Sequence, residues 1–92
     1  MFVVIAYDIV CDRRRQRLAK LLSGYGERVN FSVFECDLKP RQFDRLQQRI
    51  AKSINPDEDR VRFYELCLDC LKRVQVQGRT STLFRDKSLV VV

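Results

Sequence analysis

The chain has 92 residues, of which 46% are hydrophobic and 33% are charged, and its formal net charge is +6. This composition suits one small folded domain, because it is too apolar for disorder and lacks the roughly 20 consecutive apolar residues of a membrane span. The absence of histidine excludes Ser-His and Cys-His nucleophilic catalysis within one chain. The cationic excess favours a polyanion such as nucleic acid or anionic lipid.

The first apolar segment ends in a carboxylate. Residues 2–7 carry no charged side chain, which is typical of a central strand covered on both faces, and Asp8 follows directly. An acid at the end of such a strand lies at the edge of the sheet, where it is able to hold a metal ion. Asp8 is therefore the first candidate for chemistry. In the structural alternative, Asp8 caps the next segment or pairs with Arg15 or Arg28.

Residues 12 to about 25 predict an amphipathic helix, with Asp12 as its N-cap. Gly24 and Gly26 are expected to end it, because either is able to adopt a positive φ. The apolar stripe at helical spacing consists of Leu18, Leu21, Leu22 and Tyr25.

The start of this predicted helix is rich in cations. Cations are unfavourable near a helix N-terminus, and a bound phosphate would relieve that placement. We therefore predict phosphate contacts for these arginines, with a solvated helix face as the alternative. The residues concerned are Arg13, Arg14, Arg15 and Arg17.

Residues 27–38 are dense in β-forming side chains and predict two strands, a short one and a longer one, separated by a kink near Asn30. We expect the longer strand to be buried on both faces. Its apolar residues are Phe31 and Val33 on one side and Phe34 and Cys36 on the other.

A second helix is predicted to begin at Pro40, which suits a first turn. Residues 55–59 then predict an acidic turn, and residues 60–68 predict the third strong strand. Residues 74–76 predict a weak strand. The apolar segment 89–92 is expected to add to a sheet edge, because an exposed apolar strand would invite aggregation. The buried stripe of the second helix consists of Phe43, Leu46, Ile50 and Ile54.

The predicted order is strand, helix, two strands, helix, strand, which is the α+β, ferredoxin-like βαββαβ sandwich with extra C-terminal strands. Residues 1–92 form one domain. The two helices of this fold cover one face of the sheet, yet the strands beginning at Phe2 and Phe31 are apolar on both faces. We therefore predict a homodimer packed sheet against sheet, in which strand 89–92 adds to the partner subunit's sheet.

The chain has four cysteines, and reduced thiols are expected in a cytoplasmic protein. Cys67 and Cys70 form a C-x-x-C pair, which also occurs in zinc sites and redox sites. The lack of a second such pair weakens the case for a zinc site, so we predict that these cysteines are buried thiols. The N-terminal apolar run is too short for a signal peptide, which predicts a cytoplasmic location.

Over nearly its whole length the sequence resembles the CRISPR-associated Cas-two proteins, the small core subunits of spacer acquisition. The run from Gly26 to Cys36 is the most specific part, and Asn30 stands where many relatives carry Gln. Cys67 and Cys70 resemble one branch of the family. The other matching segments are Tyr7-Asp8-Ile9, Asp12 with Arg14 and Arg15, and residues 59–64.

The resemblance implies a homodimeric endonuclease that depends on Mg²⁺, or alternatively Mn²⁺, and acts on RNA or double-stranded DNA. It also implies that the dimer bridges two dimers of the Cas-one integrase and holds DNA. Asp8, one from each subunit, is implied as the metal-binding and catalytic acid, with Tyr7 and Ser32 as further catalytic residues and Phe34 in support. Nucleic-acid contacts are implied for Arg13, Arg14, Arg15, Arg17 and Arg28.

Bland alternatives stay open for the supporting residues: Tyr7 and Phe34 as core aromatics, and Ser32 as a local backbone hydrogen-bonding group. Because Mg²⁺ is held by one or two carboxylates with water and phosphate oxygens, paired acids in a dimer suffice. Such an ion would polarise a phosphodiester and activate water. The alternative function is a non-catalytic DNA-binding scaffold with a structural Asp8. A weaker alternative is a toxin-type ribonuclease, which should lack the 26–36 run.

Overall fold

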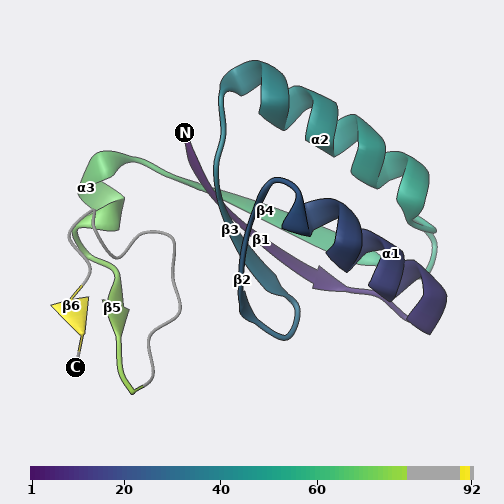
Figure 1. Cartoon of the computed structure of the whole chain (residues 1–92), viewed down its shortest axis with the longest axis horizontal. Coiled ribbons are helices and arrows are strands. Elements are labelled where there is room, and N and C mark those ends of the chain that lie inside the picture. Colours follow the sequence, from purple (N-terminus) through teal and green to yellow (C-terminus); the bar gives the residue numbers. More distant parts are fainter. Residues whose placement is uncertain (79–89, 92) are drawn as a thin grey trace.

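The structure is a computed structural model that describes residues 1–78 and 90–91. Expectations for residues 79–89 and 92 lie outside the described residues. None of the helices in the described ranges is long and apolar enough to cross a membrane. The elements (Figure 1) are β1 (Phe2–Asp8), α1 (Asp12–Ser23), β2 (Gly26–Asn30), β3 (Val33–Asp37), α2 (Pro40–Ser53), β4 (Arg60–Leu66), α3 (Leu68–Leu71), β5 (Gln75–Val76) and β6 (Val90–Val91).

Four antiparallel strands form the main sheet in the order β2-β3-β1-β4, and α1 and α2 lie together on one side of it (Figure 1). This confirms the ferredoxin-like arrangement predicted from the sequence. The central strand is β1, whose Val4 lies opposite Glu35 of β3 and Tyr64 of β4. At its end, Asp8 lies opposite Arg60.

The helices bury one face of the sheet. Alternate residues of β1 (Val3, Ile5 and Tyr7) face the helices, and full burial of each aliphatic side chain contributes about 1.5–3 kcal/mol. The predicted stripes of both helices are confirmed. The rest of the core consists of Ile9, Leu18, Leu22, Phe34, Cys36, Leu38, Leu46 and Ile50.

The other face of the sheet is apolar but only partly covered in the single chain. Phe2, Val4 and Ala6 of β1 are partly buried, and Tyr64 of β4 is 47% exposed. α1 and α2 lie on the opposite side of the sheet (Figure 1), and the short helix α3 contacts β4. The burial predicted for both faces of β1 is therefore complete on one face only, and the homodimer that would cover the other stays a prediction.

The kink predicted near Asn30 is a chain reversal between two antiparallel strands. Asn30 ends β2, Phe31 and Ser32 make the turn, and β3 begins at Val33. The prediction that Phe31 is buried was wrong. Its side chain is 72% exposed, because it lies in the turn rather than in a strand of the sheet.

The ends of α1 differ from the sequence expectation. Asp12 is the first helical residue, and Cys11 is the N-cap without a side-chain hydrogen bond. Gly24 ends the helix with a φ of −80°, so no left-handed residue is needed there. Gly26 is required for space instead, because a Cβ atom would collide with the Glu35 carbonyl and the Cys36 sulfur.

The region after β4 also corrects the prediction. The strand ends at Leu66 rather than Leu68, and Leu68 begins the short helix α3 with 65% of its surface exposed. β5 pairs in parallel with β6 of the same chain, with Gln75 opposite Val90. The addition of strand 89–92 to a partner subunit's sheet stays a prediction, and its first and last residues lie outside the described ranges.

Candidate active site and basic surface

Asp8 ends the central strand with an exposed side chain. Because successive side chains of a strand alternate, Asp8 lies on the helix-free face while Tyr7 before it faces the helices. Within the described ranges no side chain or backbone group forms a hydrogen bond or ion pair with the Asp8 carboxylate. The carboxylate is therefore available to a ligand.

Two shallow hollows flank Asp8. One of about 200 Å³ is lined by Asp8, Arg15 and Ser32, three of the residues singled out by the resemblance, and their functional roles stay predictions. The Tyr7 N–H donates to the Ser32 carbonyl at 3.1 Å, which fastens the β2–β3 turn to the end of β1. The second hollow, of about 230 Å³, contains Arg60 and Arg62, which sequence reasoning missed. Only the β1–β4 register, which sequence spacing does not give, places these cations near Asp8.

Tyr7 and Phe34 belong to the core. Tyr7 is 6% exposed and its ring stacks on Phe34 with centroids 6.3 Å apart. The Tyr7 hydroxyl donates to the Phe31 carbonyl at 3.4 Å and accepts from Arg28 at 3.4 Å. These contacts agree with the alternative in which Tyr7 and Phe34 are core aromatics. Because the Tyr7 ring and the Asp8 carboxylate lie on opposite faces of the sheet, a shared catalytic role for them stays a prediction.

Arg28 holds the β2–β3 turn. Its Nε and Nη2 atoms donate to the Phe31 carbonyl at 3.1 and 2.7 Å. The guanidinium also lies over the rings of Phe31 and Phe34, at 5.6 and 5.7 Å from their centroids, where a cation is attracted by the ring faces. Several of its donors are therefore used within the turn.

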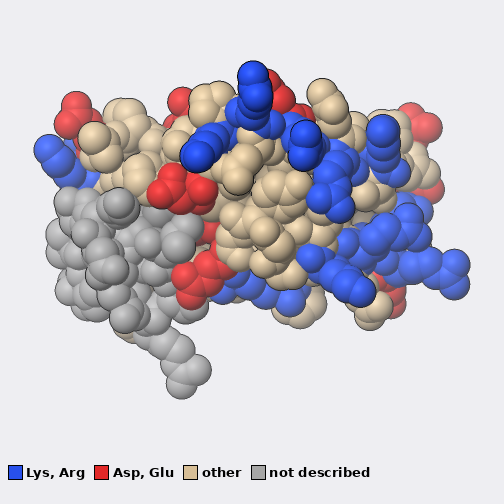
Figure 2. Space-filling model, turned by 45° about the horizontal axis from the view of Figure 1, so that its top comes forward, with Lys and Arg blue, Asp and Glu red and all other residues tan. Residues whose placement is uncertain are grey.

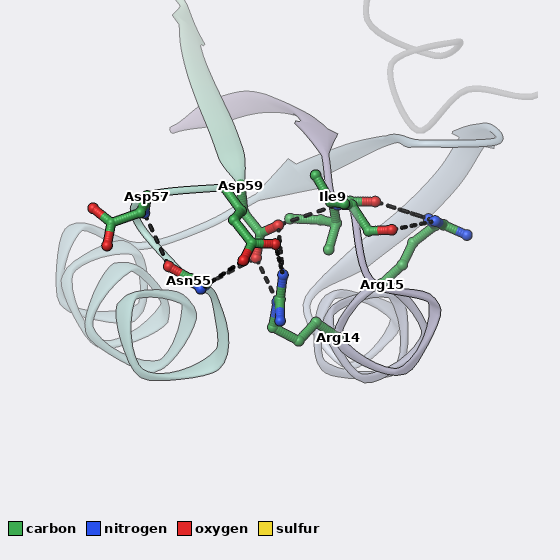
Figure 3. Close-up of polar contacts among 8 residues, drawn as sticks. Ile9, Arg14, Arg15, Asn55, Asp57 and Asp59 are labelled. Carbon is green, nitrogen blue, oxygen red and sulfur yellow. Dashed lines mark hydrogen bonds and ion pairs between the residues drawn. The ribbon is translucent and has the colours of Figure 1, made fainter.

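Arg14 is held by a buried carboxylate (Figure 3). Its Nε and Nη2 atoms donate to Asp59 at 2.7 and 3.2 Å, and the backbone N–H groups of Val10 and Asn55 donate to the same carboxylate at 3.1 and 2.8 Å. The hydrogen bonds from Arg14 lower the pKa of Asp59 to about 2, and those from Asn55 and Val10 add to this against the opposing effect of burial. Residues 55–59 are thus more than an acidic turn. The Nε and Nη2 donors of Arg14 are used within the chain, and phosphate binding by Arg14 stays a prediction.

The other arginines of α1 divide into two groups. Arg15 donates to the Ile9 carbonyl from Nε and Nη2, which fixes the loop after Asp8 (Figure 3). Its Nη1 atom donates to Asp12 at 2.6 Å. Arg13 and Arg17 are exposed and form no side-chain hydrogen bond or ion pair with any described residue. These two are available for phosphate contacts.

A larger hollow of about 710 Å³ lies between α1 and α2 and is rich in cations. Arg49 donates to the Tyr25 hydroxyl at 3.0 Å and lies over its ring. Figure 2 shows Lys and Arg side chains gathered over the helical side of the molecule. No binding role was predicted for Arg49 and Lys52, although their i, i+3 spacing on one helix was the available signal. The four cations of this basic groove are Arg17, Lys20, Arg49 and Lys52.

The donor set at Asp8 fits a hard divalent cation that shares its shell with other oxygens. Carboxylate and hydroxyl oxygens of Asp8 and Ser32 are the ligand type that Mg²⁺ prefers. In the part of the chain that the structure describes, no three Cys, Asp or Glu side chains gather as a metal site. For such a cation the remaining oxygens would have to come from water, from substrate phosphate or from a second copy.

The comparisons with known proteins agree with the resemblance. Residues 1–74 match the family described as CRISPR associated protein Cas2. A Synechocystis protein named CRISPR-associated endoribonuclease Cas2 3 is 51% identical over 88 residues, which cover 96% of each chain. The crystal structure of Streptococcus pyogenes Cas2 at pH 6.5 has a TM-score of 0.76 and 35% identity, covering 85% of this chain and 100% of that one. A chain of a partial Cas6-RT-Cas1–Cas2 complex has a TM-score of 0.63 and 37% identity, covering 78% and 84%.

Proposed function

The chain belongs to the CRISPR-associated Cas2 family, and we propose that it is a Mg²⁺-dependent endonuclease that cleaves RNA or double-stranded DNA as a subunit of the spacer-acquisition complex. The observation that carries the proposal is the exposed Asp8 carboxylate beside Ser32, with no partner among the described residues. The name endoribonuclease carried by the Synechocystis relative supports phosphodiester chemistry and makes RNA the first substrate to test.

Cleavage requires a homodimer, because one chain supplies one Asp8. The helix-free face of the sheet supports such a dimer, since Phe2, Val4 and Ala6 are left partly exposed there and Tyr64 is 47% exposed. Asp8 lies on this same face, so packing of two copies through it puts both Asp8 side chains at one interface. Burial of these apolar groups is the driving force for association.

Asp8 from each subunit would hold the metal ion. When bound, Mg²⁺ supplies Lewis-acid polarisation of the phosphodiester and a lowered pKa for water, which replaces the missing histidine. Mn²⁺ shares the preference for oxygen ligands. Ser32 and Arg15 line the same hollow and would orient the phosphate, while the contacts of Arg15 with the Ile9 carbonyl keep the loop after Asp8 in place.

Comparison of wild type with Asp8→Asn tests this function. Labelled RNA and duplex DNA are incubated with Mg²⁺, Mn²⁺ or EDTA, and Asp57→Asn is the matched control because it removes an exposed carboxylate from the loop between α2 and β4. We expect Asp8→Asn to lower metal-dependent cleavage about a hundred-fold or more and the control to leave it unchanged. Cleavage that persists in Asp8→Asn, or in EDTA, would contradict the proposal.

A second function, a non-catalytic DNA-binding scaffold that bridges Cas1 integrase dimers, is favoured by the basic groove between α1 and α2. Its four cations line one hollow of about 710 Å³, where a phosphate backbone would meet several positive charges. The similarity to a chain from a Cas1–Cas2 complex supports Cas1 as a partner. In this function Asp8 is structural and the groove carries the affinity.

The groove is tested by the double variant Arg17→Gln/Lys52→Gln. We expect weaker duplex binding and a log-log salt slope lowered by about 2, because two phosphate contacts are lost. Lys72→Gln/Arg73→Gln removes two exposed cations outside the groove and serves as the control. Equal salt slopes for the two double variants would exclude the groove as the DNA-binding surface. Absence of cleavage in the wild type, together with this loss of binding, would favour the scaffold.

A further inference from the structure

Cys67 and Cys70 lie side by side at the surface. Their Sγ atoms are hydrogen-bonded at 3.3 Å, and the Cys70 N–H donates to Cys67 Sγ at 3.4 Å. Both side chains are exposed, so the prediction of buried thiols was wrong for this pair. The reason is that β4 ends at Leu66 and the chain turns into α3, which carries both cysteines away from the sheet.

The local backbone holds the two sulfurs together. Cys67 is the N-cap of α3 and Cys70 is the third residue of that helix. Side chains three residues apart lie on the same side of a helical turn. A disulfide requires the two sulfur atoms to close from 3.3 Å to about 2.05 Å.

The other two cysteines are unlike this pair. Cys36 is fully buried, and burial raises the pKa of its thiol to about 11. Cys11 is half-buried, and backbone hydrogen bonds from Arg14 and Arg13 lower the pKa of its thiol. Among the described residues, however, the only contact between cysteine sulfurs is that of Cys67 with Cys70. The hydrogen bonds from Cys70, the backbone N–H first and the side chain next, lower the pKa of Cys67. A lowered pKa increases the thiolate fraction, and the thiolate is the reactive species.

Metal binding is less well supported by the same geometry. A structural zinc site takes four ligands. Across residues 1–78, for which side chains are described, no third Cys, Asp or Glu gathers with Cys67 and Cys70. An exposed pair of close thiols without further ligands fits thiol–disulfide exchange.

We propose that Cys67 and Cys70 form a reversible intramolecular disulfide by exchange with a low-molecular-weight disulfide such as oxidised glutathione. The Cys67 thiolate attacks one glutathione sulfur, the S–S bond of glutathione breaks, and one glutathione thiolate leaves. Cys70 gives its proton to solvent and attacks Cys67 Sγ, which releases the second glutathione thiolate. The protein dithiol loses two electrons, and oxidised glutathione is reduced to two glutathione molecules.

This site is separate from the proposed active site. In the antiparallel pair of β1 and β4, Asp8 lies opposite Arg60 while Phe2 lies opposite Leu66. α3 follows Leu66, so the cysteines and Asp8 lie at opposite ends of the sheet, about 20 Å apart along β1. The disulfide would fix the junction between β4 and β5, and the inference does not rest on the proposed nuclease activity.

The test exposes the full chain to buffers of graded oxidised-to-reduced glutathione ratio, followed by acid quenching, alkylation of free thiols and peptide mapping by mass spectrometry. We expect two alkylation sites, Cys67 and Cys70, to be lost together in a chain that stays monomeric on a non-reducing denaturing gel. Dithiothreitol should restore both. Cys70→Ser should stop at one glutathione attached to Cys67, and Cys11→Ser should behave as wild type.

Three results would overturn the proposal. Both thiols could remain fully alkylated at the highest ratio of oxidised to reduced glutathione. The disulfide could form between chains instead of within one. The purified protein could hold zinc that protects both thiols until a chelator removes it, which would make the pair a metal site.

Discussion

Two aspartates at the same end of the sheet have opposite surroundings. Asp8 ends β1 opposite Arg60, and Asp59 immediately precedes Arg60 in the chain. Asp8 is exposed with no side-chain partner in the described ranges, whereas the Asp59 side chain is fully buried and accepts four hydrogen bonds. The role of each carboxylate thus follows from the donors that the fold places around it, and not from its position beside a strand.

Asp59 joins three segments near the candidate site. Its partners are Arg14 of α1, Val10 of the loop after β1 and Asn55 of the loop before β4 (Figure 3). Val10 is two residues after Asp8, so this junction helps to set where the exposed carboxylate stands. The buried acid stabilises the fold and leaves the exposed acid free for chemistry.

The largest effect on stability is expected for Asp59→Asn. The amide keeps the size of the side chain but removes the charge that faces Arg14 and one acceptor oxygen. We expect the melting temperature to fall by roughly 10 °C or more. Thermal unfolding followed by circular dichroism measures this. Asp57→Asn, an exposed change in the same loop, should shift the melting temperature by about 2 °C or less, and equal shifts for the two variants would contradict the assignment.

The second-largest effect on stability is expected from lowering the pH. Because the folded-state pKa of Asp59 is lowered from 3.8 to about 2, its stabilisation is fully present above pH 3.8 and is lost as the pH falls through about 2. Denaturant midpoints measured from pH 7 to pH 2 should therefore fall in the wild type over this lower range. The fall should be smaller in Asp59→Asn, which lacks the titrating group, and parallel curves would exclude Asp59 as its source.

The smallest effect is expected for Asp8→Asn. Since no described residue pairs with the Asp8 carboxylate, its removal should change the melting temperature by about 2 °C or less. The same variant is expected to lose cleavage, so the two measurements separate chemistry from folding. A destabilisation as large as that of Asp59→Asn would show that Asp8 is structural.

Local patterns were sufficient to predict most elements of the fold. The uninterrupted apolar run of β1 and the helical spacing of Leu46 and Ile50 each depend on neighbours in the sequence, and both are confirmed. The order of elements then led to the ferredoxin-like sheet. The family resemblance led to Asp8 and Ser32, which the structure brings into one hollow.

Long-range contacts were not predictable in this way. Asp57, Glu58 and Asp59 look alike in the sequence. Only the folded chain brings Arg14 to the last two of them, with its Nη2 donating to the exposed Glu58 and both Nε and Nη2 donating to the buried Asp59. The burial of Phe31 was predicted wrongly because Phe31 continues the alternation of apolar residues in β3, although it lies in the turn before that strand. The exposed Cys67 was missed because the end of β4 depends on where its pairing with β1 stops.

The central position of β1 has a consequence for synthesis on the ribosome. Both edges of β1 are paired in the finished fold, one with β3 and the other with β4, which spans Arg60–Leu66. A nascent chain that has emerged only as far as α2 therefore presents the most apolar strand of the protein with one edge unpaired. Such an edge is a template for wrong pairing. Two nascent chains on one messenger RNA therefore both expose an unpaired edge of β1, which is able to pair with the other chain until β4 leaves the exit tunnel.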